Sequence, residues 1–230
     1  MTALVPALSL SLAGYLAGLW LHRRAGNSPL LHPVALGTFI IAAALGLLAL
    51  GGFPFAEPYI EHNAILIEAL FLGVVAFALP LIENVRKLVR DLFGILACAI
   101  LSSAALGMIT LALSLLAGFS GPEIAALSLR TVTQPIAVAI AAANGLSVDV
   151  VMLAVFVTGI AVVIAGEPLL RMAGVRDERH VGLALGITSH TFGVVRALEI
   201  GPLCAAYAMT GMLVTGLVYA FALPLLLRLL

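Results

Sequence analysis

The most chemically distinctive stretch of this sequence is GITSHTFGVVRALE, residues 186–199. It places a serine, an imidazole, a guanidinium and a carboxylate in an apolar neighbourhood, as Ser189, His190, Arg196 and Glu199. A guanidinium at mid-membrane is costly unless it is partnered, and Arg196 and Glu199 are spaced to pair on one helical face. These residue types predict a site that binds a small polar anion, with Ser189, His190, Thr191 and Arg196 as ligands. His190 and Glu199 are the candidates for proton coupling and charge pairing, because an imidazole titrates near neutral pH.

A second polar interruption reads SLRTVTQPIA, residues 128–137. Pro135 removes a backbone donor and disfavours helix at the residue before it, so a break is expected near 131–135. A half-helix that begins at Pro135 would expose free N–H groups and a partial positive charge, which suit an anion. The polar residues expected to bind substrate at this break are Arg130, Thr131, Thr133 and Gln134.

These residues also have a structural interpretation. Arg130 and Arg196 could bind the exposed carbonyls of broken helices, and His190 could be a packed core residue. Catalysis is not expected, because adjacent Ser189 and His190 point about 100° apart on a helix and cannot form a dyad. The sequence has no metal-ligand or cofactor motif either. We therefore expect no enzyme, no catalytic residue, no metal and no cofactor.

Composition places these interruptions in a membrane. The 230 residues are 63% hydrophobic and only 10% charged, too few charges to cover the surface of a soluble domain. The net charge of zero argues against a nucleic-acid partner. The sequence predicts one integral membrane domain, 1–230, of the all-α polytopic class, in the bacterial inner membrane.

About six full transmembrane helices are expected, with two interrupted ones. Apolar runs of sufficient length to cross a bilayer lie at 3–21, 30–50, 64–82, 92–118, 148–170 and 202–227. The interrupted runs are 122–143 and 181–200, with Pro135, Gly186 and Gly193 as the expected helix breakers. Glu167, next to Pro168, is expected to cap the run 148–170. Gly14 and Gly18, and Gly182 and Gly186, have the spacing of helix-packing residues.

Charge distribution predicts the orientation. Basic residues follow the first run, the third run and Leu170, whereas 51–63 holds only acidic ones, which places the N-terminus outside. If 122–143 and 181–200 each dip in and return, the units 92–143 and 148–200 are inverted repeats, as in many secondary transporters. The alternative is that both interrupted helices cross completely, which requires an exception to the charge rule.

At these two motifs the sequence resembles the LrgB family, also called the CidB/LrgB family. Members carry Lys-Ser-Val-Thr-Thr-Pro-Ile-Ala and, about fifty residues later, Gly-Thr-Ala-Ser-His-Gly-Ile-Gly-Thr-Ala-Arg-Ala-Leu-Glu; the matching stretches here are 130–137 and 186–199. The resemblance covers roughly 30–230. Ser189, His190, Arg196 and Glu199 are retained. Arg130 stands where the family has Lys and Gln134 where it has Thr, and Thr191-Phe192 replaces Gly-Ile, so substrate preference could differ.

The resemblance implies two functions from different classes. Family relatives are linked to transport of short monocarboxylates such as pyruvate, acetate, glycolate and glycerate. The family was also described as antiholin-like, controlling murein hydrolase activity and autolysis beside a small LrgA-type membrane protein. The implied partners are a small carboxylate, an LrgA-type subunit, the lipid bilayer and further copies of the chain. Transport requires the polar residues at the breaks, whereas a regulator would depend on its helix-packing glycines.

Overall fold

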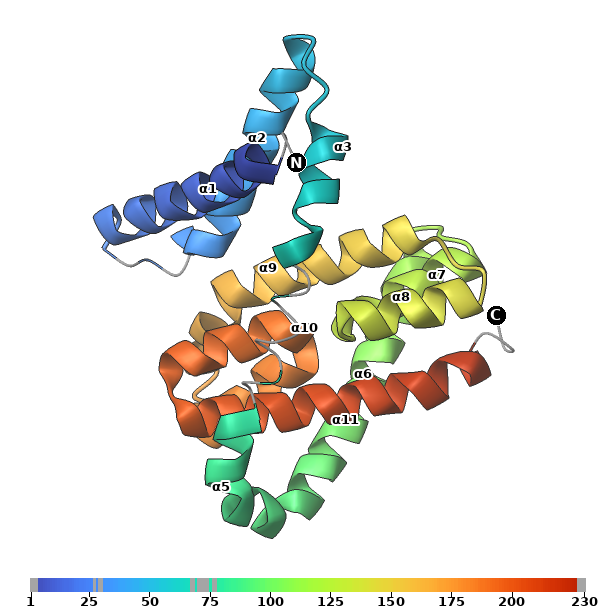
Figure 1. The fold of residues 1–230 in the computed structure, drawn as a ribbon. Helices are drawn as coiled ribbons and strands as arrows, with labels where there is room; N and C mark the ends of the chain where they lie inside the picture. The colour runs from blue at the N-terminus through green and yellow to red at the C-terminus, as the bar shows by residue number, and fades with distance from the viewer. Residues whose placement is uncertain are drawn as a thin grey trace. The chain divides into compact units, whose positions relative to one another are not determined.

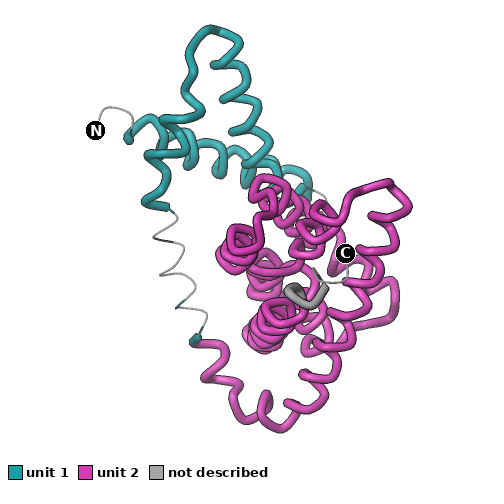
Figure 2. Tube along the Cα trace, turned by 90° about the vertical axis from the view of Figure 1, so that its right-hand side faces the viewer, with its two compact units in different colours: residues 1–78 teal, residues 79–230 magenta. Residues whose placement is uncertain are grey.

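The structure, a computed structural model, describes residues 4–26, 28, 31–66, 69, 75 and 78–226. These residues contain helices and turns but no strand. The chain divides into two compact units, residues 1–78 and 79–230, drawn in different colours in Figure 2. Nine of the 19 residues of the predicted span 64–82 lie outside the described residues.

The first unit contains α1 (Leu4–Arg24), α2 (Pro33–Leu50) and the short α3 (Ala56–His62). Helices α1 and α2 approach closely: a Cβ atom on Gly18 would lie 2.5 Å from the carbonyl oxygen of Pro33. A Cβ atom on Gly14 would lie 2.4 Å from the Ile41 side chain. The predicted role of this glycine pair in helix packing is therefore confirmed. Ser11 Oγ lies 2.9 Å from Tyr59 Oη and links α1 to α3.

The second unit begins with α5 (Ala78–Arg90) and the long α6 (Leu92–Leu116). The predicted interrupted run 122–143 follows as α7 (Gly121–Ser128), the 3-10 turn η2 (Leu129–Thr131) and α8 (Gln134–Ala143). Helix α7 starts where it does because the Glu123 carboxylate accepts hydrogen bonds from both the backbone N–H and the hydroxyl of Ser120.

Three long helices complete this unit: α9 (Val148–Met172), α10 (Glu178–Ile200) and α11 (Pro202–Leu226). Figure 1 shows α10 and α11 lying side by side, with α8 between α9 and α11. The backbones of α10 and α11 nearly touch, because Cβ atoms on Gly182 and Gly186 would lie 2.1 Å and 1.8 Å from carbonyl oxygens of α11. The expected packing role of this glycine pair is confirmed as well.

The all-α polytopic fold is confirmed: six described helices are long and apolar enough to cross a membrane. They are α1, α2, α6, α9, α10 and α11. This set includes α10, which the sequence predicted as an interrupted helix, and omits the run 64–82. Both candidate repeat units begin with a 25-residue helix, α6 and α9. The inverted relationship between the units, and the choice between re-entrant and crossing segments, remain predictions.

Candidate functional site

The first polar interruption breaks the helical path between η2 and α8. Val132 and Thr133 adopt extended backbone conformations, with φ/ψ of −93°/152° and −60°/140°. Helix α8 then begins at Gln134, with Pro135 in its first turn, where a missing N–H is tolerated. Thr133 is half-buried, while Gln134 and Pro135 are exposed.

Arg130 is held beside this interruption by a neutral partner. Its Nε and Nη2 atoms donate to Thr110 Oγ1 in α6 at 3.2 and 3.1 Å. The Thr110 hydroxyl donates in turn to the Leu106 carbonyl, which fixes its orientation. Within the described part of the chain, no carboxylate pairs with Arg130. The half-buried guanidinium therefore has no carboxylate counter-ion among these residues.

The second interruption lies at Ser189 and His190 within α10. Their φ/ψ angles are −143°/27° and 45°/−132°, both outside the helical region. Among described residues other than glycine, His190 alone has a positive φ. Ser189 Oγ donates to the Leu185 carbonyl at 3.0 Å, and Thr191 Oγ1 contacts Met212 Sδ at 3.9 Å. The departure from helical geometry falls between Gly186 and Gly193, the two expected breakers.

Both glycines also pack closely against neighbouring atoms. Gly186 abuts the α11 backbone, as described above. A Cβ atom on Gly193 would lie 2.1 Å from the Leu185 carbonyl oxygen and 2.5 Å from Ser189 Oγ. Ser189 Oγ donates to that same carbonyl. A side chain at position 193 would therefore clash with both atoms of this hydrogen bond, which lies in the kinked turn.

Val155 of α9 connects the two interruptions. Its side chain belongs to a buried apolar cluster that contains Leu129 and Val132 from the first interruption. Its carbonyl accepts a hydrogen bond from His190 Nε2, 3.2 Å away, in the second. Because a carbonyl can only accept, Nε2 carries a proton in this arrangement. Turn η2 also contacts α9, α10 and α11, so the fold brings Arg130, Thr131 and the kink of α10 to one region.

Arg196 lies beyond the kink in a network of carboxylates. Its guanidinium pairs with Glu199 on the same helix and with Glu167 of α9, where Nη2 and Oε2 are 2.5 Å apart. Glu167 also pairs with Arg171. The predicted cap at Glu167 is wrong, because α9 continues to Met172 and the Glu167 side chain is buried inside it. A lone carboxylate in an apolar run was the signal that could have placed it in the site.

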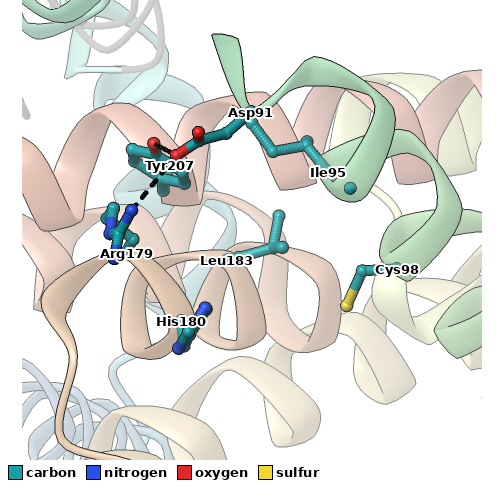
Figure 3. Close-up of a pocket in the computed structure, with 8 residues that line it drawn as sticks. Asp91, Ile95, Cys98, Arg179, His180, Leu183 and Tyr207 are labelled. Carbon is teal, nitrogen blue, oxygen red and sulfur yellow. Dashed lines mark hydrogen bonds and ion pairs between the residues drawn. The ribbon is translucent and has the colours of Figure 1, made fainter. Parts of the chain in front are cut away.

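The sequence did not point to a pocket between α6, α10 and α11 that Figure 3 shows. It has a volume of about 420 Å³ and is lined by Asp91, Gly94, Ile95, Cys98, Arg179, His180, Leu183 and Tyr207. Tyr207 donates to Asp91 at 2.6 Å, and Arg179 pairs with Asp91 at 3.3 Å. Asp91 lies outside the spanning helices, and the hydrogen bond from Tyr207, with help from Arg90, lowers its pKa. The partners of Asp91 lie on α5, α10 and α11, so this carboxylate connects three helices. The pocket lies at the end of the bundle that is predicted to face the cytoplasm.

No group of three or more histidine, cysteine or acidic side chains among the described residues is arranged to hold a metal ion. The site is instead built from cationic and hydroxyl side chains around two non-helical turns. Such an arrangement suits an organic anion with oxygen atoms.

The sequence is similar to known bacterial proteins along most of its length. The chain is 30% identical to the uncharacterised protein YxaC of Bacillus subtilis, over 94% of this chain and 92% of that protein. It is 29% identical to the holin-like protein CidB of Staphylococcus epidermidis, over 88% of this chain and 87% of that one. An uncharacterised protein of Haemophilus influenzae is 28% identical over 96% of this chain and 93% of its own length. No solved structure matches. Since residues 11–229 match the LrgB-like family, the chain belongs to that family and is a multi-pass bacterial membrane protein.

Proposed function

We propose that this protein is a secondary transporter of small monocarboxylates, of the pyruvate, glycolate, glycerate or acetate class. The substrate site is the region where η2 meets the kink of α10. Proton coupling through His190 is part of the proposal, because its imidazole lies at that kink and is hydrogen-bonded to the Val155 carbonyl.

The observation that supports the proposal most directly is that the Arg130 guanidinium is hydrogen-bonded to a neutral side chain. A half-buried guanidinium whose hydrogen bonds among the described residues go to a neutral threonine hydroxyl can still offer donors and charge to a substrate carboxylate. Arg196 differs, because Glu167 and Glu199 already neutralise it. A substrate carboxylate at Arg196 would have to displace one of these two partners. We therefore assign carboxylate binding to Arg130 and charge pairing to Arg196.

Uptake of labelled pyruvate and glycolate into proteoliposomes, with and without a proton gradient, tests this assignment. Arg130→Ala should reduce uptake at least about tenfold, because a hydrogen bond to a charged group contributes about 1.5–3 kcal/mol. Arg130→Lys should keep much of the activity, since the charge is retained and only the fork geometry is lost.

Arg176→Ala is the matched control. Arg176 is exposed in the loop between α9 and α10, so its loss removes the same charge far from the kink. Equal uptake by wild type, Arg130→Ala and Arg176→Ala would contradict carboxylate binding by Arg130. If none of the acids is taken up, even with a co-purified small LrgA-type subunit, transport itself is excluded.

The name of one relative favours a second function. A holin-like protein with near full-length similarity makes an antiholin-like regulator of murein hydrolase activity the alternative. Such a regulator would act through assembly with a small holin-like subunit. It predicts that Arg130→Ala leaves autolysis and co-purification unchanged, while Gly186→Ala disrupts both by separating α10 from α11. Transport predicts that Arg130→Ala assembles normally and fails in uptake.

A further inference from the structure

Three buried hydroxyls have no hydrogen-bond partner among the residues that the structure describes. They are the side chains of Ser103 on α6, Thr131 on η2 and Thr215 on α11, which are 2%, 2% and 0% exposed. Only one other buried side-chain nitrogen or oxygen atom in the described part of the chain lacks a partner, Arg196 Nε. An unsatisfied hydroxyl in such surroundings is costly, so each of these exceptions requires an explanation.

Five other hydroxyls in the same unit follow the usual solution. In membrane helices, serine and threonine hydroxyls commonly donate to the carbonyl one turn earlier. Those that do so here are Thr110, Ser128, Thr188, Ser189 and Thr210. The three exceptions have the same local option and do not use it, which indicates that their hydroxyls serve something outside their own helices.

Tyr219 links α6 and α11, the helices that carry two of these hydroxyls. Its Oη donates to the Ser103 carbonyl at 3.2 Å. It also lies beside the Thr131 hydroxyl, without hydrogen-bond geometry, and is close enough to Arg130 to feel its charge. Thr215 lies one turn before Tyr219 on α11, on the same helical face. The three hydroxyls therefore come from α6, η2 and α11, and η2 is joined to α6 by the Arg130–Thr110 hydrogen bonds and contacts α11.

The local charge decides what these hydroxyls would bind. Hydroxyl oxygens can coordinate a cation, but the uncompensated guanidinium of Arg130 repels one, and no described carboxylate offsets it by pairing with Arg130. Hydroxyls can equally donate to the oxygen of an anion held by Arg130. The combination of a guanidinium with several hydroxyls fits a carboxylate that carries a second oxygen on its neighbouring carbon.

We propose that Ser103, Thr131 and Thr215 form the subsite that recognises the C2 oxygen of a 2-hydroxy or 2-oxo acid. The inference rests on the proposed transport function and assigns Arg130 to the carboxylate of the same substrate. Acetate lacks the C2 oxygen and leaves the subsite hydroxyls unpaired, so the site discriminates against it.

The test compares uptake of labelled pyruvate, glycolate and acetate by proteoliposomes containing the full chain. The Thr215→Val change replaces the hydroxyl by a methyl group and keeps the volume of the side chain. We expect the ratio of pyruvate to acetate uptake to fall about tenfold, because pyruvate loses a partner and acetate does not. Ser103→Ala should shift the ratio in the same direction, and Thr215→Ser should keep the wild-type ratio.

Two matched controls remove hydroxyls from the same helices. Thr210→Val changes a threonine on α11 whose hydroxyl bonds only to the Ala206 carbonyl among the contacts described. Ser102→Ala changes the residue next to Ser103. The Ser102 hydroxyl lies 3.9 Å from Cys98 Sγ. Both should leave the uptake ratio unchanged. Size-exclusion profiles identify any variant that does not fold, and Ser103→Ala then replaces Thr215→Val as the decisive change.

The outcomes separate the two proposals. If wild type transports these acids and neither Thr215→Val nor Ser103→Ala changes the ratio, the subsite is wrong and transport stands. Uptake by wild type is also measured with and without external sodium. If wild-type uptake depends on sodium and Thr215→Val abolishes that dependence while the pyruvate-to-acetate ratio stays unchanged, the hydroxyls bind a cation and the inference is also overturned. If wild type transports none of the acids, the proposed function fails and the subsite with it.

Discussion

Arg196 in α10 and Glu167 in α9 form an ion pair between neighbouring helices, with Nη2 and Oε2 2.5 Å apart. Their side chains are only 20% and 9% exposed, so the pair is largely removed from water. A pair in such surroundings contributes little compared with apolar packing, but removal of one partner leaves a costly charge behind. The pair therefore ties the helix after the kink to α9.

Glu167→Ala should destabilise the protein by about 2–3 kcal/mol, because Arg196 then keeps only the more exposed Glu199 as a partner. In a double-mutant cycle, Arg196→Ala and Glu167→Ala together should cost at least about 1 kcal/mol less than the sum of the single changes. Denaturation of the purified protein in detergent measures each value. Glu199→Ala, at a carboxylate 42% exposed, is the matched control and should cost less than Glu167→Ala. Strict additivity of the first pair would show that they are not coupled.

Asp177 predicts a dependence of stability on acid pH. It precedes α10, where its carboxylate caps the backbone N–H of Arg179 and pairs with the guanidinium of the same residue. The Arg179 side chain lowers the pKa of Asp177 from 3.8 to about 2. Because folding lowers this pKa, the ionised carboxylate stabilises the protein above about pH 3.8, and this contribution disappears as the pH falls toward 2.

Asp177→Asn isolates that contribution, since asparagine also caps helices but carries no charge. The variant should melt below wild type at pH 7, and the difference in Tm should shrink as the pH is lowered from 5 toward 2. The effect at pH 7 should be small, because the pair is partly exposed and screened by salt. A difference in Tm that stays constant across this range would show that the charge of Asp177 does not stabilise the fold.

Much of this fold was predictable because membrane helices obey length and hydropathy rules. The spans at α1, α2, α6, α9 and α11 were expected within a few residues. The interruption before Pro135 was expected too, since proline acts through local sterics that sequence alone determines. The packing of Gly182 and Gly186 followed from their spacing for the same local reason.

What could not be predicted depends on contacts between distant segments. Glu167 was expected to be a local cap, because nothing in the sequence tells which helix lies against it. Nothing in the sequence singles out Ser103 and Thr215, since their lack of a hydrogen-bond partner is visible only in three dimensions. The pairing of Asp91 with Tyr207 joins residues more than a hundred positions apart and leaves no local pattern.

Gly186→Ala should destabilise the protein by several kcal/mol, because its Cβ would lie 1.8 Å from the Ala208 carbonyl oxygen and force α10 away from α11. Gly94→Ala is the matched control. Gly94 is also helical, with no atom within 4 Å of its missing Cβ, so alanine there should be neutral or stabilise by up to about 1 kcal/mol. Thermal unfolding of both variants measures the contrast. Equal melting temperatures would contradict the close approach of the two helices.

His190→Gln tests the proposed proton coupling. Glutamine can still donate an N–H group to the Val155 carbonyl, but it does not titrate. Proton-driven pyruvate uptake should therefore lose its stimulation by an inward proton gradient, while counterflow exchange of pyruvate continues. Thr191→Val, one residue away, is the control and should keep the response to the gradient. Unchanged gradient dependence in His190→Gln would remove this histidine from the coupling step.

The backbone conformation at His190 predicts that a glycine variant is more stable than an alanine variant at this position. Its φ of 45° with ψ of −132° suits glycine and strains every residue with a Cβ, at a cost of about 1–3 kcal/mol. His190→Ala and His190→Gly both lose the ring, its hydrogen bond to Val155 and its packing on Phe192. Only the alanine variant keeps the strain, so His190→Gly should melt higher by about 2 °C or more, although glycine usually weakens a helix. At Ala197, which is buried in the regular helix beyond the kink, a change to glycine should instead lower the melting temperature. If His190→Ala is the more stable of the two, α10 does not bend at this residue through a positive φ.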